Sequence, residues 1–112
     1  MKLMVYVMND VTLLDRFMID LKSKGIKGAT IINSTGMGRM LSESTDDMNI
    51  IGSLKFLFNG PRSESRVLLM ALEDEQIETV LAIIDNYAGD LTKPNSGIVF
   101  TLPIDFIKGY KK

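Results

Sequence analysis

Two glycines and an arginine form the most chemically informative cluster in the chain. Gly36, Gly38 and Arg39 follow a short β-branched segment, Thr30 to Ile32, in the order Gly-x-Gly-Arg. Glycine amides can approach phosphate oxygens closely, and an arginine guanidinium pairs with phosphate or carboxylate through two parallel hydrogen bonds. The pattern therefore predicts an anion-binding turn at the end of a strand. The alternative is that the glycines only shape a turn and that Arg39 is a solvated surface charge.

Composition excludes several classes of site. The chain has 112 residues with 13 basic and 14 acidic side chains, a formal net charge of −1, no histidine and no cysteine. This balance leaves no basic surplus for a phosphate backbone, so we expect no nucleic-acid partner. The usual zinc ligands, thiol nucleophiles and near-neutral proton shuttles are missing, and we expect no enzymatic activity. The acid pairs Asp46-Asp47 and Glu73-Asp74 fit solvation and helix capping rather than catalysis.

The hydropathy pattern predicts a single domain that does not insert into a membrane. No apolar run approaches the roughly 20 residues that a membrane helix needs. The apolar start over residues 1–8 is too short for a signal sequence and is followed directly by Asn9 and Asp10. We therefore expect a cytoplasmic protein without membrane insertion, folded as a single domain over residues 1–112.

Six elements are expected to position the glycine cluster. Apolar runs predict strands at 3–8, 29–34, 67–72 and 98–102, and apolar spacings of three and four residues predict helices at about 11–24 and 73–88. The order βαββαβ predicts an α+β, ferredoxin-like fold with an antiparallel four-stranded sheet and both helices on one face. Because runs such as VLLMAL are apolar throughout, the uncovered sheet face predicts association with other copies of the chain.

Residues 40–65 interrupt this regular order. A polar stretch, the apolar run IIGSLKFLF and a second polar stretch follow one another. Loops of this length in small domains are commonly functional or mobile. The segment predicts either a long mobile loop that offers an apolar surface or an extra hairpin or short helix packed on the body.

The sequence resembles the P-II signal-transduction family, which includes the nitrogen regulatory proteins. The motifs that carry the resemblance are GIKGATI at 25–31, TGMGR at 35–39 and the helix, loop and strand over 73–100. Members of that family are ferredoxin-like trimers that bind adenine nucleotides in clefts between subunits. The resemblance implies a homotrimer that regulates a partner protein, a transporter or a metabolic enzyme, through the long loop. The residues themselves fix no cofactor; the resemblance implies an adenine nucleotide such as ATP, ADP or AMP.

The same resemblance implies which residues bind the ligand. Residues 28–30 match the segment that meets the adenine from the neighbouring subunit, residues 36–39 match the base of the loop beside the phosphates, and residues 92–97 stand where the family has its phosphate loop. The family's phosphate loop is GDGK-like, but here no lysine stands immediately before Ile98, and Lys93 or Lys108 would supply the missing charge. The predicted ligand-binding residues are Gly28, Ala29, Thr30, Gly36, Met37, Gly38, Arg39, Lys93, Asn95, Ser96, Gly97 and Lys108.

The chain departs from the family pattern at residue 40 and in the loop over residues 92–97, and it lacks the loop tyrosine that some members have modified. Met40 stands where ATP-binding members usually carry a glutamine, and Pro94 in TKPNSG has no amide proton to donate. These departures argue against the standard sensing of ATP, magnesium and 2-oxoglutarate. An alternative is a metal-binding trimer resembling the divalent-cation tolerance proteins, with Glu43, Asp46 and Asp47 as oxygen ligands for a hard cation.

Overall fold

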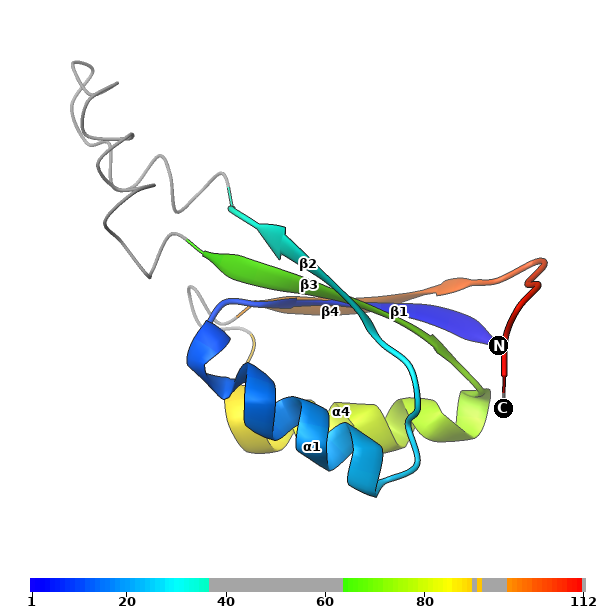
Figure 1. The fold of residues 1–112 in the computed structure, drawn as a ribbon, viewed down its shortest axis with the longest axis horizontal. Helices are drawn as coiled ribbons and strands as arrows, with labels where there is room; N and C mark the ends of the chain where they lie inside the picture. Colours follow the sequence, from blue (N-terminus) through cyan, green and yellow to red (C-terminus); the bar gives the residue numbers. More distant parts are fainter. Residues whose placement is uncertain (37–63, 90, 92–96, 112) are drawn as a thin grey trace, which may run out of the picture.

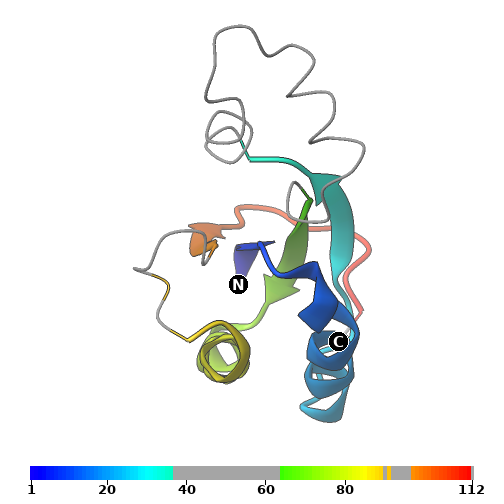
Figure 2. The same cartoon turned by 90° about the vertical axis from the view of Figure 1, so that its left-hand side faces the viewer.

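A four-stranded antiparallel sheet covered on one face by two helices makes up the body of the protein (Figures 1 and 2). The computed structural model describes residues 1–36, 64–89, 91 and 97–111. The elements are β1 (Lys2–Met8), a 3₁₀ turn (Val11–Leu13), α1 (Leu14–Ser23), β2 (Thr30–Ser34), β3 (Ser65–Leu72), α4 (Asp74–Ala88) and β4 (Ile98–Pro103). The strand order is β2-β3-β1-β4. This is the ferredoxin-like βαββαβ arrangement, and the predicted fold class is confirmed.

Local signals set the 3₁₀ turn before α1 and the end of α1. The Asp10 carboxylate caps the 3₁₀ turn by accepting a hydrogen bond from the backbone N–H of Thr12 at 3.1 Å. At its end Gly25 has φ +83°, and its N–H donates to the carbonyl of Lys22 at 3.0 Å. The next N–H, of Ile26, donates to the carbonyl of Leu21 at 2.9 Å. This pair of bonds is a Schellman motif, which requires the left-handed conformation that glycine adopts most easily.

Alternation along the two central strands builds the core. β1 and β3 pair antiparallel with Met4 opposite Met70 and Tyr6 opposite Leu68, so these side chains share the face toward the helices. The helices contribute the other half of the core. The buried apolar side chains are Met4, Tyr6, Met8, Phe17, Leu21, Ile26, Leu68, Met70, Leu72, Val80, Ile83 and Ile84.

An aromatic cluster joins the sheet to both helices. Phe17 of α1 is fully buried, and its ring centroid lies 5.5 Å from that of Tyr6 in β1 and 6.2 Å from that of Tyr87 in α4. The Tyr87 hydroxyl donates a hydrogen bond to the Asp20 carboxylate, which links the two helices and raises the pKa of Tyr87. Burial, and then the nearby charge of Asp10, raises the pKa of Tyr6. Both phenols are therefore neutral at physiological pH.

The sheet face opposite the helices is apolar and uncovered in the described part of the chain. The register places residues of all four strands on this face, for example the row from Ile32 across Val67 and Val7 to Ile98. We call the following residues the open face: Leu3, Val5, Val7, Ile32, Val67, Leu69, Ala71, Ile98, Phe100 and Leu102. On the edge strand β4 three of them remain 43–55% exposed. Large exposed apolar surfaces of this kind mark sites of protein association.

Candidate functional site

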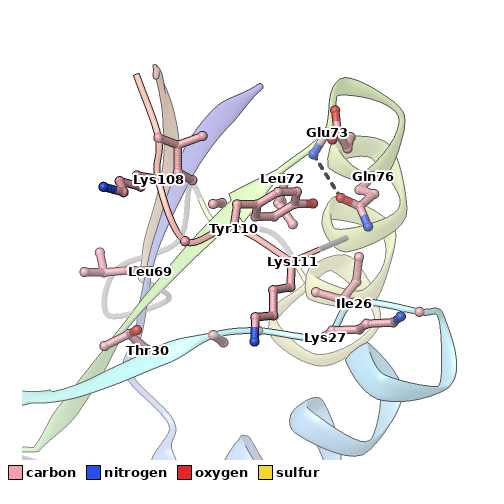
Figure 3. Close-up of a pocket in the computed structure, with 16 residues that line it drawn as sticks. Ile26, Lys27, Thr30, Leu69, Leu72, Glu73, Gln76, Lys108, Tyr110 and Lys111 are labelled. Atoms are coloured by element: carbon pink, nitrogen blue, oxygen red, sulfur yellow. Dashed lines mark hydrogen bonds between the residues drawn. The ribbon is translucent and has the colours of Figure 1, made fainter. Parts of the chain in front are cut away.

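A pocket of about 890 Å³ lies at the end of the sheet near the N-terminus and the C-terminal tail. Three segments form it: residues 25–30 between α1 and β2, residues 69–76 where β3 passes into α4, and the tail at residues 107–111 (Figure 3). The antiparallel register brings the start of β2 beside the end of β3. Just before the tail, the N–H of Ile104 donates a hydrogen bond to the carbonyl of Met1, the residue before β1, at 3.3 Å. The volume is within the range of small-molecule sites, roughly 300–1,000 Å³.

The rim of the pocket is positively charged. Among the described residues that line it, three are lysines, Lys27, Lys108 and Lys111, and one is acidic, Glu73. Figure 3 shows the three lysine side chains extending in different directions around the pocket rather than converging on one point. Because a lysine stem is long and flexible, the exposed ammonium groups of Lys108 and Lys111 can reorient toward an anion in the pocket.

The single acidic residue of the lining is engaged in a helix cap. Glu73 precedes α4, and its side chain accepts a hydrogen bond from the backbone N–H of Gln76. In return the Gln76 Oε1 accepts one from the Glu73 backbone N–H at 2.9 Å. This reciprocal capping box satisfies two backbone donors that a helix start would otherwise leave unpaired. The Glu73 side chain thus takes part in the start of α4, and its one negative charge stands against three lysines among the described lining residues.

Two further polar groups face the same region. Since the Gln76 carbonyl oxygen is held by the cap, its amide nitrogen is turned to the other side, where its two N–H groups are donors (Figure 3). The Tyr110 ring lies beside Leu72 with its hydroxyl directed toward the start of α4. Leu69 and Ala71 of the open face supply an apolar wall. The pocket thus combines an apolar wall, fixed amide donors and a cationic rim, which suits an anionic organic molecule.

The pocket brings together four of the twelve residues predicted from the sequence to bind ligand. Gly28, Ala29, Thr30 and Lys108 all line it, although the lysine is far away in the chain. Gly28 has open space where a side chain would begin, so the wall is open at this point.

Two other predicted residues lie at the opposite end of the sheet. Gly36 follows β2, whose last residue Ser34 pairs with Ser65, and Gly97 precedes β4, whose first residue Ile98 pairs with Val7. The length of β2 separates the two ends by roughly 16 Å. Within one chain, the predicted residues thus form two groups that do not meet. The other predicted positions, Met37, Gly38, Arg39, Lys93, Asn95 and Ser96, lie outside the described residues.

Glycine is required at position 97 for a structural reason that does not depend on a ligand. Its φ is +101°, and a Cβ atom placed on it would lie 2.3 Å from the carbonyl oxygen of Val7. Only glycine allows the backbone to approach β1 so closely at the start of β4.

Sequence reasoning did not select Lys27, Gln76, Tyr110 or Lys111, which also line the pocket. Lys27 lies inside the GIKGATI motif, and Tyr110 and Lys111 belong to the basic ending KGYKK. That cluster of charge in the tail is the one signal that could have indicated a role. Their proximity depends on how the tail turns around the sheet end, which the sequence pattern does not encode.

Among the residues with described positions, no group of three or more acidic side chains is arranged to hold a metal ion. Glu43, Asp46 and Asp47, the oxygen ligands of the alternative prediction, lie outside this part of the chain. Within the same described ranges, none of the helices has the length and apolarity needed to cross a membrane. In comparisons with known proteins, no family model matches the sequence and no curated protein is significantly similar to it.

Proposed function

We propose that this chain is a non-enzymatic regulatory protein of P-II-like type that binds a small anionic ligand, an adenine nucleotide, between the subunits of a homotrimer. The observation that carries the proposal is the lysine-rimmed pocket, which gathers residues 28–30 and Lys108. The resemblance to the P-II family implies a ligand-binding role for residues 28–30, and Lys108 is the tail lysine expected to supply charge. An apolar wall beside a cationic rim matches a molecule with a flat base and a phosphate.

The division of the predicted residues into two groups supports a site shared between subunits. Gly36 and Gly97 lie at one end of the sheet and residues 28–30 at the other. A ligand that contacts both groups must bridge two copies. The end of one copy that carries Gly36 and Gly97 would then lie against the end of its neighbour that carries residues 28–30. Such a head-to-tail contact is heterologous, and it closes into a ring when the rotation allows.

The open face and the two sheet edges support the same assembly. Phe100 and Leu102 on β4 are 43% and 47% exposed, and Ile32 on β2 is 46% exposed. β2 and β4 are the two edge strands, so each edge of the sheet carries backbone groups that no strand of the described chain pairs with. A trimer that packs the open faces together would bury this apolar surface, which is the main driving force for association.

In the proposed mechanism, ligand binding acts on a partner protein through the segment at residues 40–65. Ligand bound beside Gly36 would change the conformation that this segment offers to a partner protein, a transporter or a metabolic enzyme in the cytoplasm. Residues 40–63 of this segment lie outside the described residues, whereas Ser65 already belongs to β3. Its apolar run IIGSLKFLF is the part best suited to contact the partner.

Calorimetric titration of the full chain with ATP, ADP, AMP and cyclic AMP tests the ligand. We expect saturable binding of an adenine nucleotide, weakened about tenfold or more by Arg39→Ala because a charge-assisted hydrogen bond is lost. Lys22→Gln, an exposed residue of α1 away from the pocket, is the matched control and should bind as the original chain does. Absence of binding by all four nucleotides at millimolar concentration would contradict the proposal.

Sedimentation equilibrium tests the assembly. We expect a mass of about three times the 12.5 kDa of one chain. Phe100→Glu places a charge on the open face at an exposed strand position, so it should shift the mass toward the monomer without unfolding the chain. Glu78→Gln on α4 is the control and should leave the mass unchanged. A monomeric original chain at tens of micromolar would contradict a trimer.

A further inference from the structure

An amide and an aromatic ring come together where the C-terminal tail passes the start of α4. Gln76 and Tyr110 both line the pocket, and both are half-buried. Figure 3 shows Gln76 reaching from α4 toward the pocket and the Tyr110 hydroxyl directed toward the same turn of the helix. In the same view Lys108 extends away from α4. The amide and the ring thus lie on one side of the pocket and a cation on another, as a ligand with a flat body and an anionic end requires.

The capping box of α4 holds the Gln76 amide in one orientation. Its Oε1 accepts the backbone N–H of Glu73 at 2.9 Å, and the Glu73 side chain accepts the backbone N–H of Gln76. A flipped amide would place its nitrogen against the Glu73 N–H, so that two donors would face each other. The nitrogen is therefore fixed on the side away from the cap. A donor that is already oriented loses little conformational freedom when a ligand binds.

Tyr110 supplies an aromatic surface beside this donor. Its ring lies next to Leu72, whose side chain is buried, and the remaining exposure of Tyr110 leaves part of the ring accessible. A flat heterocycle that stacks on an aromatic side chain gains about fivefold or more in affinity. Tyr110 also fixes its ring with few rotatable bonds, so that little entropy is lost on binding.

We infer that Gln76 and Tyr110 determine the specificity of the pocket for a nitrogen heterocycle: the Tyr110 ring stacks on the heterocycle, and the Gln76 amide donates to an unprotonated ring nitrogen. The inference rests on the proposed function, because it names the residues that recognise the base of the proposed nucleotide. The resemblance to the P-II family assigns neither residue a role. A ring N–H at the same place is disfavoured, since it would meet a second donor.

Gln76→Glu removes the donors and keeps the cap, because glutamate serves as well as glutamine at this position of a capping box. The new charge repels an anionic ligand, so the variant is compared through ligands with the same phosphate. These are AMP and its three analogues in which the base nitrogen N1, N3 or N7 is replaced by C–H. The ratio between the affinities of an analogue and of AMP cancels the repulsion and isolates the hydrogen bond.

The experiment is calorimetric titration of the full chain with these four ligands. We expect one analogue to bind the original chain about fivefold or more weakly than AMP, and the same analogue to bind Gln76→Glu as tightly as AMP does. A residue that only caps the helix would not produce this coupling.

Substitutions of Tyr110 test the stacking in the same titrations. Tyr110→Ala should weaken AMP by about fivefold or more, whereas Tyr110→Phe keeps the ring and should stay within about twofold. Lys22→Gln on α1 is the control and should bind all four ligands as the original chain does.

The contrary results distinguish the inference from the proposed function. If AMP binds and all three analogues bind equally well, or if the same analogue loses as much with Gln76→Glu, Gln76 does not recognise a ring nitrogen. If Tyr110→Ala binds AMP as the original chain does, the ring does not stack on the base. Either result overturns the inference while the proposed nucleotide sensor stands. Absence of AMP binding also overturns it, and the titrations with ATP and ADP then decide the proposed function alone.

Discussion

Replacing Phe17 with alanine is expected to lower the free energy of unfolding by about 3–5 kcal/mol, the largest effect of any single change considered. Phe17 is fully buried and its ring contacts those of Tyr6 and Tyr87. Removing it leaves a cavity at the point where α1, α4 and the sheet meet, and the rings of the two tyrosines cannot close it without leaving their own positions. Since domains of this size are stable by only about 5–15 kcal/mol, much of the stability would be lost.

Urea unfolding followed by circular dichroism measures this effect. The matched control is Ile19→Ala on the same helix, where the side chain is 66% exposed and alanine is a better helix former. The control should change the free energy by less than about 1 kcal/mol. Equal costs for the two variants would show that α1 does not pack on the sheet through Phe17.

Gly97→Ala is expected to destabilise the chain by about 3 kcal/mol, since two penalties act together. The residue has φ +101°, which is strained for alanine, and the new Cβ would lie 2.3 Å from the Val7 carbonyl oxygen. That oxygen belongs to the backbone of β1, so the contact is relieved only if β4 moves away from the strand that it pairs with.

Alanine substitutions at two other glycines separate the cost of the positive φ from the cost of the close contact. The free energies of unfolding of all three variants are compared by urea unfolding. Gly25→Ala shares a positive φ, +83°, but meets no atom within 4 Å, so it should cost about 1–2 kcal/mol. Gly36→Ala has neither the positive φ nor a close neighbour and should be nearly neutral. If Gly97→Ala costs no more than Gly25→Ala, the close approach of β4 to β1 is wrong.

Hydrophobic periodicity was sufficient to predict the fold. The alternation in β1 and β3 and the three- and four-residue spacing in the helices depend on neighbours in the chain, so they can be read locally. β3 starts at Ser65, two residues before the predicted start at residue 67, because its pairing with β2 continues to a pair of polar residues. Ser65 and Ser34 lie opposite each other with their hydroxyl oxygens 3.0 Å apart, and Ser65 is buried.

The candidate pocket was only partly predictable. Residues 28–30 could be selected because glycines beside a strand have a recognisable local pattern. Gln76 could not, since in the sequence it is an ordinary polar residue of the first turn of a helix, and its orientation depends on the cap with Glu73. Lys111 could not be placed either, because its position depends on the path of the tail around the sheet end.

The most direct test of the proposed site is an AMP titration of the isotope-labelled full chain followed by amide chemical shifts. If the pocket holds the ligand, the earliest and largest shifts should come from Gly28, Thr30 and Lys108, together with the side-chain amide of Gln76. The exposed residues of α1 around Lys22 should stay unchanged. Saturable shifts confined to other surfaces, or no shifts at millimolar AMP, would contradict a nucleotide site in this pocket.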